Sequence, residues 1–149
     1  MNSGYTAESD PDISAKAVGR DIPVSPKFAR EVVGMIRGKK VEDATVMLEE
    51  VIALERAVPL KRYNKRVSHK PGTGPGRYPV KAAKAVLSVL ESASSNAEYK
   101  GLDASNMFIA TISVSRGTVI MGRMPRAQGR ATQWNQETVN IEVILEEEE

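Results

Sequence analysis

Thirteen of the 21 lysine and arginine residues lie in two segments that contain no acidic residue. The first segment spans residues 56–90 and the second spans residues 104–136. The rest of the chain holds 8 basic and 19 acidic residues, so the formal net charge of +2 conceals a strong segregation of charge. A single charge run is often only a solvated face. Two such segments on an acidic body favour a polyanionic partner that meets part of the surface.

The stretch GRMPRAQGRA, residues 122–131, concentrates three arginines and contains no acid and almost no residue that could join a core. Guanidinium groups bind phosphates through paired hydrogen bonds and stack on bases. Small residues beside them, such as Gly122 and Gly129, let the backbone approach a crowded surface. These features are typical of a projection that inserts into folded nucleic acid.

The sequences flanking this stretch predict two antiparallel strands, because apolar residues alternate with polar ones. The even-numbered positions of residues 108–114 are expected to share one face, as are the odd-numbered positions of residues 139–145. The connection, residues 115–137, is too long for a tight turn, so it is either a floppy loop or an extended hairpin. Because ordering each residue costs about 1–2 kcal/mol, we expect it to be mobile in the free protein and fixed by outside contacts.

The rest of the pattern predicts further helices and a strand, with no sign of a second domain. Ser25, a good N-cap, and Pro26, suited to the first helical position, open a helix that closes before Gly38. The elements expected before the strand pair are a short strand at residues 14–22 and helices at about 26–37, 41–54 and 79–99.

Both ends of the chain are acidic. Residues 1–13 hold few apolar groups and are expected to be disordered, and residues 146–149 form an acidic tail that is expected to fray. The N-terminus lacks the basic and apolar regions of a secretory signal, and no stretch approaches the roughly 18 apolar residues that span a membrane. Cysteine is absent. We therefore expect a soluble, cytoplasmic protein without disulfides, thiolate metal sites or membrane contacts.

Residues 56–78, hereafter the basic loop, contain three prolines and three glycines, so a regular element is not expected there. A structureless loop of this length is uncommon in a compact domain unless it has a function. Its basic residues alternate with aromatic rings that could stack on unpaired bases. The residues predicted to bind nucleic acid are Lys61, Arg62, Tyr63, Lys65, Arg66, His69, Lys70, Arg77, Tyr78, Lys81, Lys84, Arg116, Arg123, Arg126, Arg130 and Trp134.

A nucleotide-dependent enzyme is one alternative, because GTGPG at residues 72–76 precedes a helix. However, its spacing fits no common phosphate-binding loop, and no Lys-Ser/Thr pair follows. His69, the only histidine, is expected to be solvated or to stack on a base. Trp134 either pins the hairpin to the sheet or stacks on a base. Because no paired carboxylates and no metal-ligand cluster are recognisable, we predict no catalytic residue, cofactor, metal or small-molecule substrate.

Several short motifs occur in a fixed order along the chain. The most specific is MPRAQGRA at residues 124–131, followed by a Thr-x-x-Ile-x-Val strand pattern at residues 138–143. The others are Ser25-Pro26-Lys27, Arg37-Gly38-Lys39, Val41-Glu42-Asp43-Ala44, Asn96-Ala97-Glu98 and Gly101-Leu102-Asp103. Together they resemble the L-twenty-two family of large-subunit ribosomal proteins, over about residues 14–145.

This resemblance implies an α+β body of three helices on a three-stranded antiparallel sheet, with a long protruding β-hairpin. It also implies a structural, rRNA-binding role in the large subunit and in its assembly. The body would sit near the outlet of the peptide exit tunnel, with the hairpin tip lining the tunnel beside the L-four protein and the nascent peptide. The implied tip residues are Met124, Pro125, Arg126, Ala127, Gln128 and Gly129, flanked by Arg123 and Arg130.

Two departures from the family pattern bear on this reading. Bacterial members lack most of residues 56–78, so the chain resembles the archaeal and eukaryotic branch. Family members are usually strongly basic, whereas here acids are in excess outside the two acid-free segments. We hypothesise that the excess acid is an adaptation to high salt. A free-standing RNA- or DNA-binding regulator remains the main alternative, although regulators usually pair dimer symmetry with one recognition element.

Overall fold

Three antiparallel strands form the central sheet of the computed structural model, which describes residues 4–147. The strands are β1 (Ser14–Ile22), β5 (Met107–Arg116) and β8 (Val139–Glu147), in the spatial order β1-β8-β5. The central strand β8 pairs with both neighbours, so that Val143 lies opposite Ala17 on one side and Ile112 on the other. Strands from the two ends of the chain therefore meet in one sheet.

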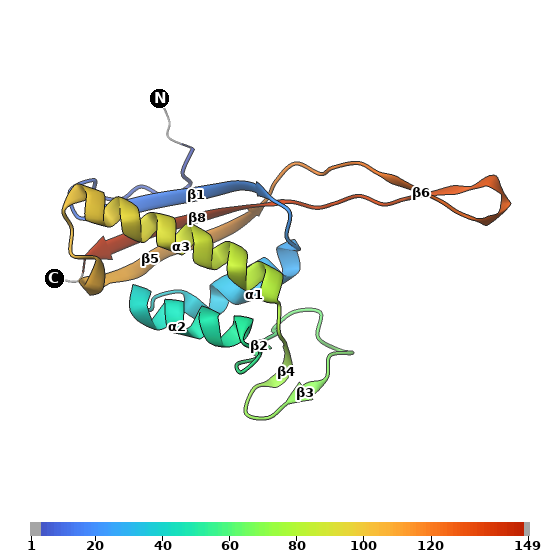
Figure 1. The fold of residues 1–149 in the computed structure, drawn as a ribbon, viewed down its shortest axis with the longest axis horizontal. Coiled ribbons are helices and arrows are strands. Elements are labelled where there is room, and N and C mark those ends of the chain that lie inside the picture. Colours follow the sequence, from blue (N-terminus) through green and yellow to red (C-terminus); the bar gives the residue numbers. More distant parts are fainter. Residues whose placement is uncertain (1–3, 148–149) are drawn as a thin grey trace.

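Three helices cover one face of this sheet (Figure 1). They are α1 (Pro26–Ile36), α2 (Val41–Ile52) and α3 (Val80–Lys100), and a short 3₁₀ turn, η1 (Ala104–Asn106), leads from α3 to β5. The odd-numbered positions of β8 from Val139 to Leu145 are fully buried beneath the helices, as the alternation predicted. The predicted α+β architecture of three helices on a three-stranded antiparallel sheet is confirmed.

Small residues let α3 approach the sheet closely. Its buried face includes Ala83, Ala93 and Ala97, each fully buried. The helices also end where the sequence indicated, because Gly38 after α1 and Gly101 after α3 adopt left-handed backbone angles, with φ of +72° and +80°. Such angles suit glycine, which has no Cβ to clash with the backbone.

Gly34 offers a direct test of helix propensity in α1. A Cβ added at this exposed position meets no atom within 4 Å. We therefore expect Gly34→Ala to stabilise the protein by about 0.5–1 kcal/mol, because alanine loses less backbone entropy in a helix. Urea unfolding followed by circular dichroism measures the change. Gly19→Ala is the control, because its Cβ would lie 2.8 Å from Val89 and is expected to destabilise.

A β-bulge alters the predicted faces of β5. Between Ile109 and Thr111 the strand advances by two residues while its partner advances by one, which leaves Ala110 as the extra residue. Met107 and Ile109 are fully buried before the bulge, and Ile112 is buried after it. The prediction that the even-numbered positions face the core is therefore wrong before the bulge and correct after it.

The face of the sheet opposite the helices is partly covered by residues 4–13, for which composition predicted disorder. The hydroxyl of Thr6 donates to Oε2 of Glu142 at 2.6 Å, and the Thr6 backbone N–H donates to the same oxygen at 3.1 Å. Glu142 is only 9% exposed, so these bonds satisfy a nearly buried carboxylate. Residues 1–3 lie outside the described residues.

The C-terminal strand runs further than the alternation indicated. The backbone N–H of Glu147 donates to the carbonyl of Ile13 at 3.1 Å, and Glu146 pairs with both Ser14 and Phe108. The first two residues of the predicted acidic tail therefore belong to β8, and residues 148–149 lie outside the described part of the chain.

Both edges of the sheet are capped by groups from the helices and their ends. On β1, the side chains of Asn96 and Lys100 each donate to a strand carbonyl at 2.8 Å. On β5, the backbone N–H of Gly38 and the guanidinium of Arg37 each donate to a strand carbonyl at 3.1 Å. Polar groups that would otherwise face solvent along an open edge thus have partners within the protein.

Candidate nucleic-acid interface

The connection between β5 and β8 is an extended β-hairpin that projects far from the body (Figure 1). Its two arms contain β6 (Arg123–Pro125) and β7 (Ala131–Gln133), which pair with each other. Nearer the body, Ile120 and Gln136 exchange two backbone hydrogen bonds, of 2.9 and 2.8 Å. A 3₁₀ turn, η2 (Ala127–Gly129), closes the tip. Of the two alternatives left open by the sequence, the structure has the extended hairpin.

Three arginines project from the outer half of this hairpin. Arg123, Arg126 and Arg130 are all exposed, and none of them contacts an acidic side chain within residues 4–147. Arg116, at the base of the hairpin, lies 3.7 Å from Glu137, and both side chains are largely exposed. Because exposed ion pairs contribute little, all four guanidinium groups are free to bind an anionic partner.

A network around Asp21 fixes the base of the hairpin to the body. Its carboxylate accepts a hydrogen bond from the backbone N–H of Thr118 at 2.8 Å and lies 3.2 Å from the hydroxyl of Thr138. That hydroxyl donates to the Thr118 carbonyl at 2.6 Å, and Asn140 accepts from the Asp21 N–H at 2.9 Å. A Cβ at Gly117 would lie within 2.6 Å of two atoms of this network, so only glycine fits there.

The pKa of Asp21 is lowered from its ordinary value, chiefly by the hydrogen bond from the Thr118 backbone and further by the hydroxyl of Thr138. A lowered pKa in the folded state means that the charged form stabilises the network. That contribution is present above the ordinary pKa of about 3.9 and is lost as the pH falls below it.

We expect Asp21→Asn to speed hydrogen exchange at the Thr118 amide at neutral pH, because the charged acceptor is lost. Exchange at core amides of β8 should stay nearly unchanged, since the network lies at the surface. Asp12→Asn, which removes an exposed acid on the N-terminal segment, is the control. Equal exchange at Thr118 in both variants would show that Asp21 does not hold the hairpin.

The basic loop contains a small sheet, so the expectation that it has no regular element is wrong. Its strands are β2 (Val58–Pro59), β3 (His69–Lys70) and β4 (Gly74–Arg77), in the order β2-β4-β3. Val58 is fully buried and anchors the loop to the core. The last three residues of the fragment GTGPG, residues 74–76, belong to β4 and pair with β2 and β3. The fragment therefore does not form a phosphate-binding turn at the start of α3.

Most of the predicted nucleic-acid-binding side chains are exposed. Lys70 and Tyr78 are the exceptions, because they are half-buried and Nζ of Lys70 lies 5.5 Å from the centroid of the Tyr78 ring. They share a hollow with Glu50 and Glu55 at the end of α2. The exposed positions are Lys61, Arg62, Tyr63, Lys65, Arg66, His69, Arg77, Lys81, Lys84, Arg116, Arg123, Arg126, Arg130 and Trp134.

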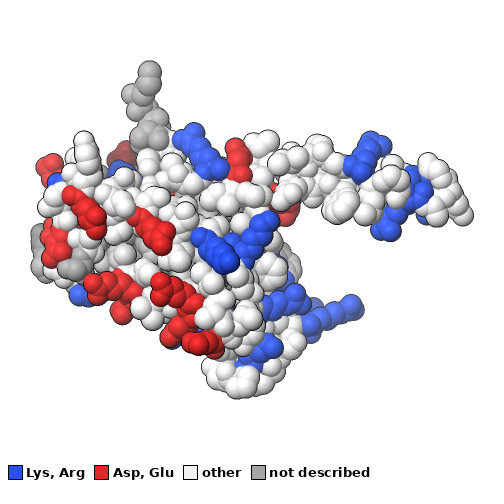
Figure 2. All heavy atoms as spheres, viewed as in Figure 1, with Lys and Arg blue, Asp and Glu red and all other residues white. Residues whose placement is uncertain are grey.

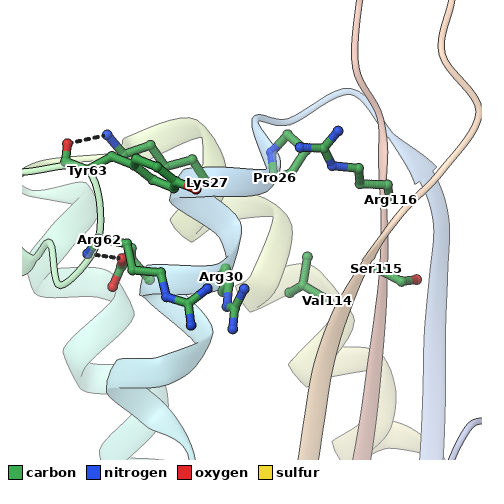
Figure 3. A pocket seen from close by; sticks show the side chains of 9 residues that line it. Pro26, Lys27, Arg30, Arg62, Tyr63, Val114, Ser115 and Arg116 are labelled. Carbon is green, nitrogen blue, oxygen red and sulfur yellow. Dashed lines mark hydrogen bonds between the residues drawn. The ribbon is translucent and has the colours of Figure 1, made fainter.

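A groove between α1, the basic loop and the end of β5 gathers further cations (Figure 3). Nζ of Lys27 donates to the Tyr63 carbonyl at 3.0 Å and lies 5.9 Å from the centroid of the Tyr63 ring. Glu31, the one acid in the groove, accepts a hydrogen bond from the backbone N–H of Arg62 at 3.1 Å. The charged residues that line the groove are Lys27, Arg30, Glu31, Arg62 and Arg116.

Lys27 and Arg30 were missed by the sequence analysis because they lie outside both acid-free segments. Their spacing of three residues places them on one side of α1, which is a signal that the sequence carries. What the sequence does not show is that the basic loop and the end of β5 lie beside that side of the helix. The groove therefore places the cations of α1 between Arg62 of the first acid-free segment and Arg116 of the second.

Trp134 lies in the hairpin and is 66% exposed. The interpretation that this side chain pins the hairpin to the sheet is therefore wrong, because a pinning residue would be buried against the body. The indole remains available for a partner, which leaves stacking on a base as the prediction that stands.

Charge is divided between two sides of the molecule. Figure 2 shows most acids of this face over α2 and α3, and cations on the hairpin and around the basic loop, although some acids also lie where the hairpin leaves the body. The basic loop and the hairpin thus lie at the same end of the body, although the 36 residues 79–114 separate them in sequence. Such a surface attracts a polyanion to the hairpin and the basic loop in preference to α2.

Residues 4–147 lack two features that other functions would require. No group of three or more metal-binding side chains occurs there. Within the same residues, none of the helices has the length and apolar character to cross a bilayer.

Known proteins match this chain over nearly its whole length. Residues 17–146 match the family described as ribosomal protein L22p/L17e. The large ribosomal subunit protein uL22 of Methanothrix thermoacetophila is 54% identical over 136 residues, covering 89% of this chain and 90% of the relative. The proteins of the same name from Methanocaldococcus jannaschii and Methanococcoides burtonii are 49% and 48% identical, each covering 96% of this chain and 94% and 95% of the relative. These matches confirm the resemblance drawn from the sequence motifs: the chain belongs to the ribosomal protein L22p/L17e family and is similar to its archaeal members.

Proposed function

We propose that this protein is a structural constituent of the large ribosomal subunit and binds large-subunit rRNA through the hairpin and the basic loop. The observation that carries the proposal is that the basic loop and the hairpin lie at the same end of the body and both expose cations (Figure 2). An RNA fold placed between them would contact both, and each phosphate neutralised would add salt-dependent affinity. The archaeal relatives bear the name of a large-subunit protein, which supports this assignment.

The hairpin tip is proposed to line the nascent-peptide exit tunnel, near the hairpin of the L-four protein. A narrow two-stranded projection with small residues at its end can pass through a crowded RNA wall and reach a channel. Ala127 and Gly129 lie in the closing turn, and Gln128 adopts a left-handed φ of +63° that makes the turn tight. The body would remain at the tunnel outlet, with its acidic side facing solvent.

This role requires no catalysis. Membership in a ribosomal protein family supports a structural part in translation and subunit assembly rather than an enzymatic one. It also implies residence in the cytoplasmic ribosome, with rRNA, neighbouring ribosomal proteins and the nascent peptide as partners. No cofactor or small-molecule substrate enters the proposal. The adaptation of the acidic side to high salt stays a prediction.

Sedimentation of a cell lysate through a sucrose gradient tests the proposal. We expect the protein to migrate with the large subunit and to leave that fraction after digestion with RNase. If the protein stays in the soluble fraction at native ionic strength, family membership would reflect ancestry alone. A free-standing RNA- or DNA-binding regulator would then be the better assignment.

A further inference from the structure

A hollow of about 730 Å³ lies in the corner between the base of the hairpin and the body. Ile120, Met121 and Trp134 line it from the hairpin, while Pro23 and Lys81 line it from the body. Lys81 belongs to the first turn of α3, which begins on the side of the body from which the hairpin projects (Figure 1). The volume falls within the roughly 300–1,000 Å³ of typical small-ligand sites, so the hollow has room for a nucleotide.

The wall of this hollow that the hairpin supplies contains several apolar side chains, although the hairpin has no hydrophobic core of its own. Ile120, Met121 and Trp134 are 58%, 78% and 66% exposed. Single exposed apolar residues need no explanation, but adjacent ones mark an interaction site. The backbone N–H of Trp134 donates to the carbonyl of Gly122 at 2.8 Å, which fixes the backbone of Trp134 against the opposite arm. A Cβ at Gly122 would lie 2.5 Å from the carbonyl oxygen of Trp134, so only glycine allows the two arms to approach this closely here.

The body wall supplies the charge. Lys81 is exposed on the rim, and Lys84 follows three residues later on the same side of α3. The one acid in the lining, Glu137, lies 3.7 Å from Arg116 and is partly neutralised by it. An aromatic face beside ammonium groups matches a nucleotide, whose base stacks while its phosphate pairs with a cation. An apolar protein segment would leave Lys81 without a partner.

We propose that this corner holds one unstacked base of the bound RNA, stacked on Trp134, with its phosphate beside Lys81. The inference deepens the proposed function and rests on it, because it assumes that RNA fills the space beside the hairpin. It adds a specific role for the hollow: the corner accepts an unpaired nucleotide, whereas the arginines of the hairpin contact paired and unpaired backbone alike.

Trp134 is the only tryptophan, so intrinsic fluorescence reports on this hollow alone. The full chain is titrated with a short single-stranded oligoadenylate and, separately, with a short blunt-ended RNA duplex. Binding of each RNA is followed in parallel by the anisotropy of a label on the RNA. We expect both to bind through the exposed cations, but only the single strand to quench Trp134 strongly, because base pairing keeps the bases of the duplex from the indole.

Three substitutions sharpen the test. Trp134→Ala is expected to weaken oligoadenylate binding about 5- to 150-fold, the effect of losing one base–aromatic stack, and to leave duplex binding unchanged. Trp134→Phe should restore most of the affinity, because a phenyl ring still stacks. Lys81→Ala should weaken quenching by the single strand. Tyr99→Ala is the matched control, because this ring is 93% exposed on α3 far from the corner.

The outcomes separate this inference from the proposed function. If both RNAs bind but Trp134 fluorescence stays unchanged and Trp134→Ala binds normally, the nucleotide site is wrong and RNA binding stands. If neither RNA binds by anisotropy, the proposed function fails and this inference with it. A blue shift of the emission on adding proteins extracted from large subunits, without quenching by RNA, would assign the hollow to a protein segment.

Discussion

Replacing Arg123, Arg126 and Arg130 together with alanine is expected to weaken binding to large-subunit rRNA strongly at low salt and less at high salt. Each cation that neutralises a phosphate contributes about 0.7–0.9 to the slope of log K against log salt concentration. If all three contact phosphates, the slope should therefore fall by about 2–3. The free energy of unfolding should change by less than about 0.5 kcal/mol, because all three side chains are exposed and outside the core.

Filter binding over a range of salt concentrations measures the slope. The matched control replaces the same three residues with lysine. Lysine keeps the charge but cannot form paired hydrogen bonds with phosphate, so we expect an unchanged slope with a reduced affinity. An alanine variant whose slope equals that of the natural protein would show that these arginines do not contact RNA phosphates.

Ile141→Ala is expected to lower the free energy of unfolding by about 2–5 kcal/mol. Ile141 is fully buried in the central strand of the sheet and lies between Gly19 and Val114 on the two neighbouring strands. Its truncation leaves a cavity that the strands on both sides cannot easily fill. Since small domains are stable by only about 5–15 kcal/mol, this single change removes a large share of the total.

Urea unfolding measures the loss, and Val119→Ala provides the control. Val119 is 40% exposed at the base of the hairpin and belongs to no core cluster. Its truncation should change the free energy by less than about 0.5 kcal/mol. Comparable losses in the two variants would mean that Val119 makes stabilising contacts as extensive as those of Ile141, contrary to its exposure.

The helices and the paired strands could be predicted from periodicity, because burial on one side leaves a clear signal in the sequence. Glycine and proline at the helix ends placed α1 to within one or two residues. The faces of β5 could not be predicted throughout, since one extra residue at Ala110 reverses the alternation. Nothing in the local sequence marks that residue, because the bulge arises from pairing with β8.

The candidate interface could be predicted from the sequence as two basic segments, but the surface that they form in the fold could not. Exposure of the hairpin arginines followed from the absence of any apolar pattern around them. The contribution of Lys27 and Arg30 depends on tertiary contacts, as does the network at Asp21. Asp21 has a φ of +50°, an uncommon angle for a residue with a side chain, and the structure shows the hydrogen bonds that hold it there. Contacts between residues far apart in sequence cannot be predicted from the spacing of residues along the chain.

The capped edges of the central sheet have a consequence for the protein before it meets its partner. A sheet with open edges can recruit strands from other copies and start aggregation. Here Asn96 and Lys100 occupy carbonyls along β1, and Arg37 and Gly38 occupy carbonyls along β5. The uncapped end of β5 carries Arg116, and like charges oppose the approach of a second copy. These contacts leave fewer backbone groups on which a strand from a second copy could add.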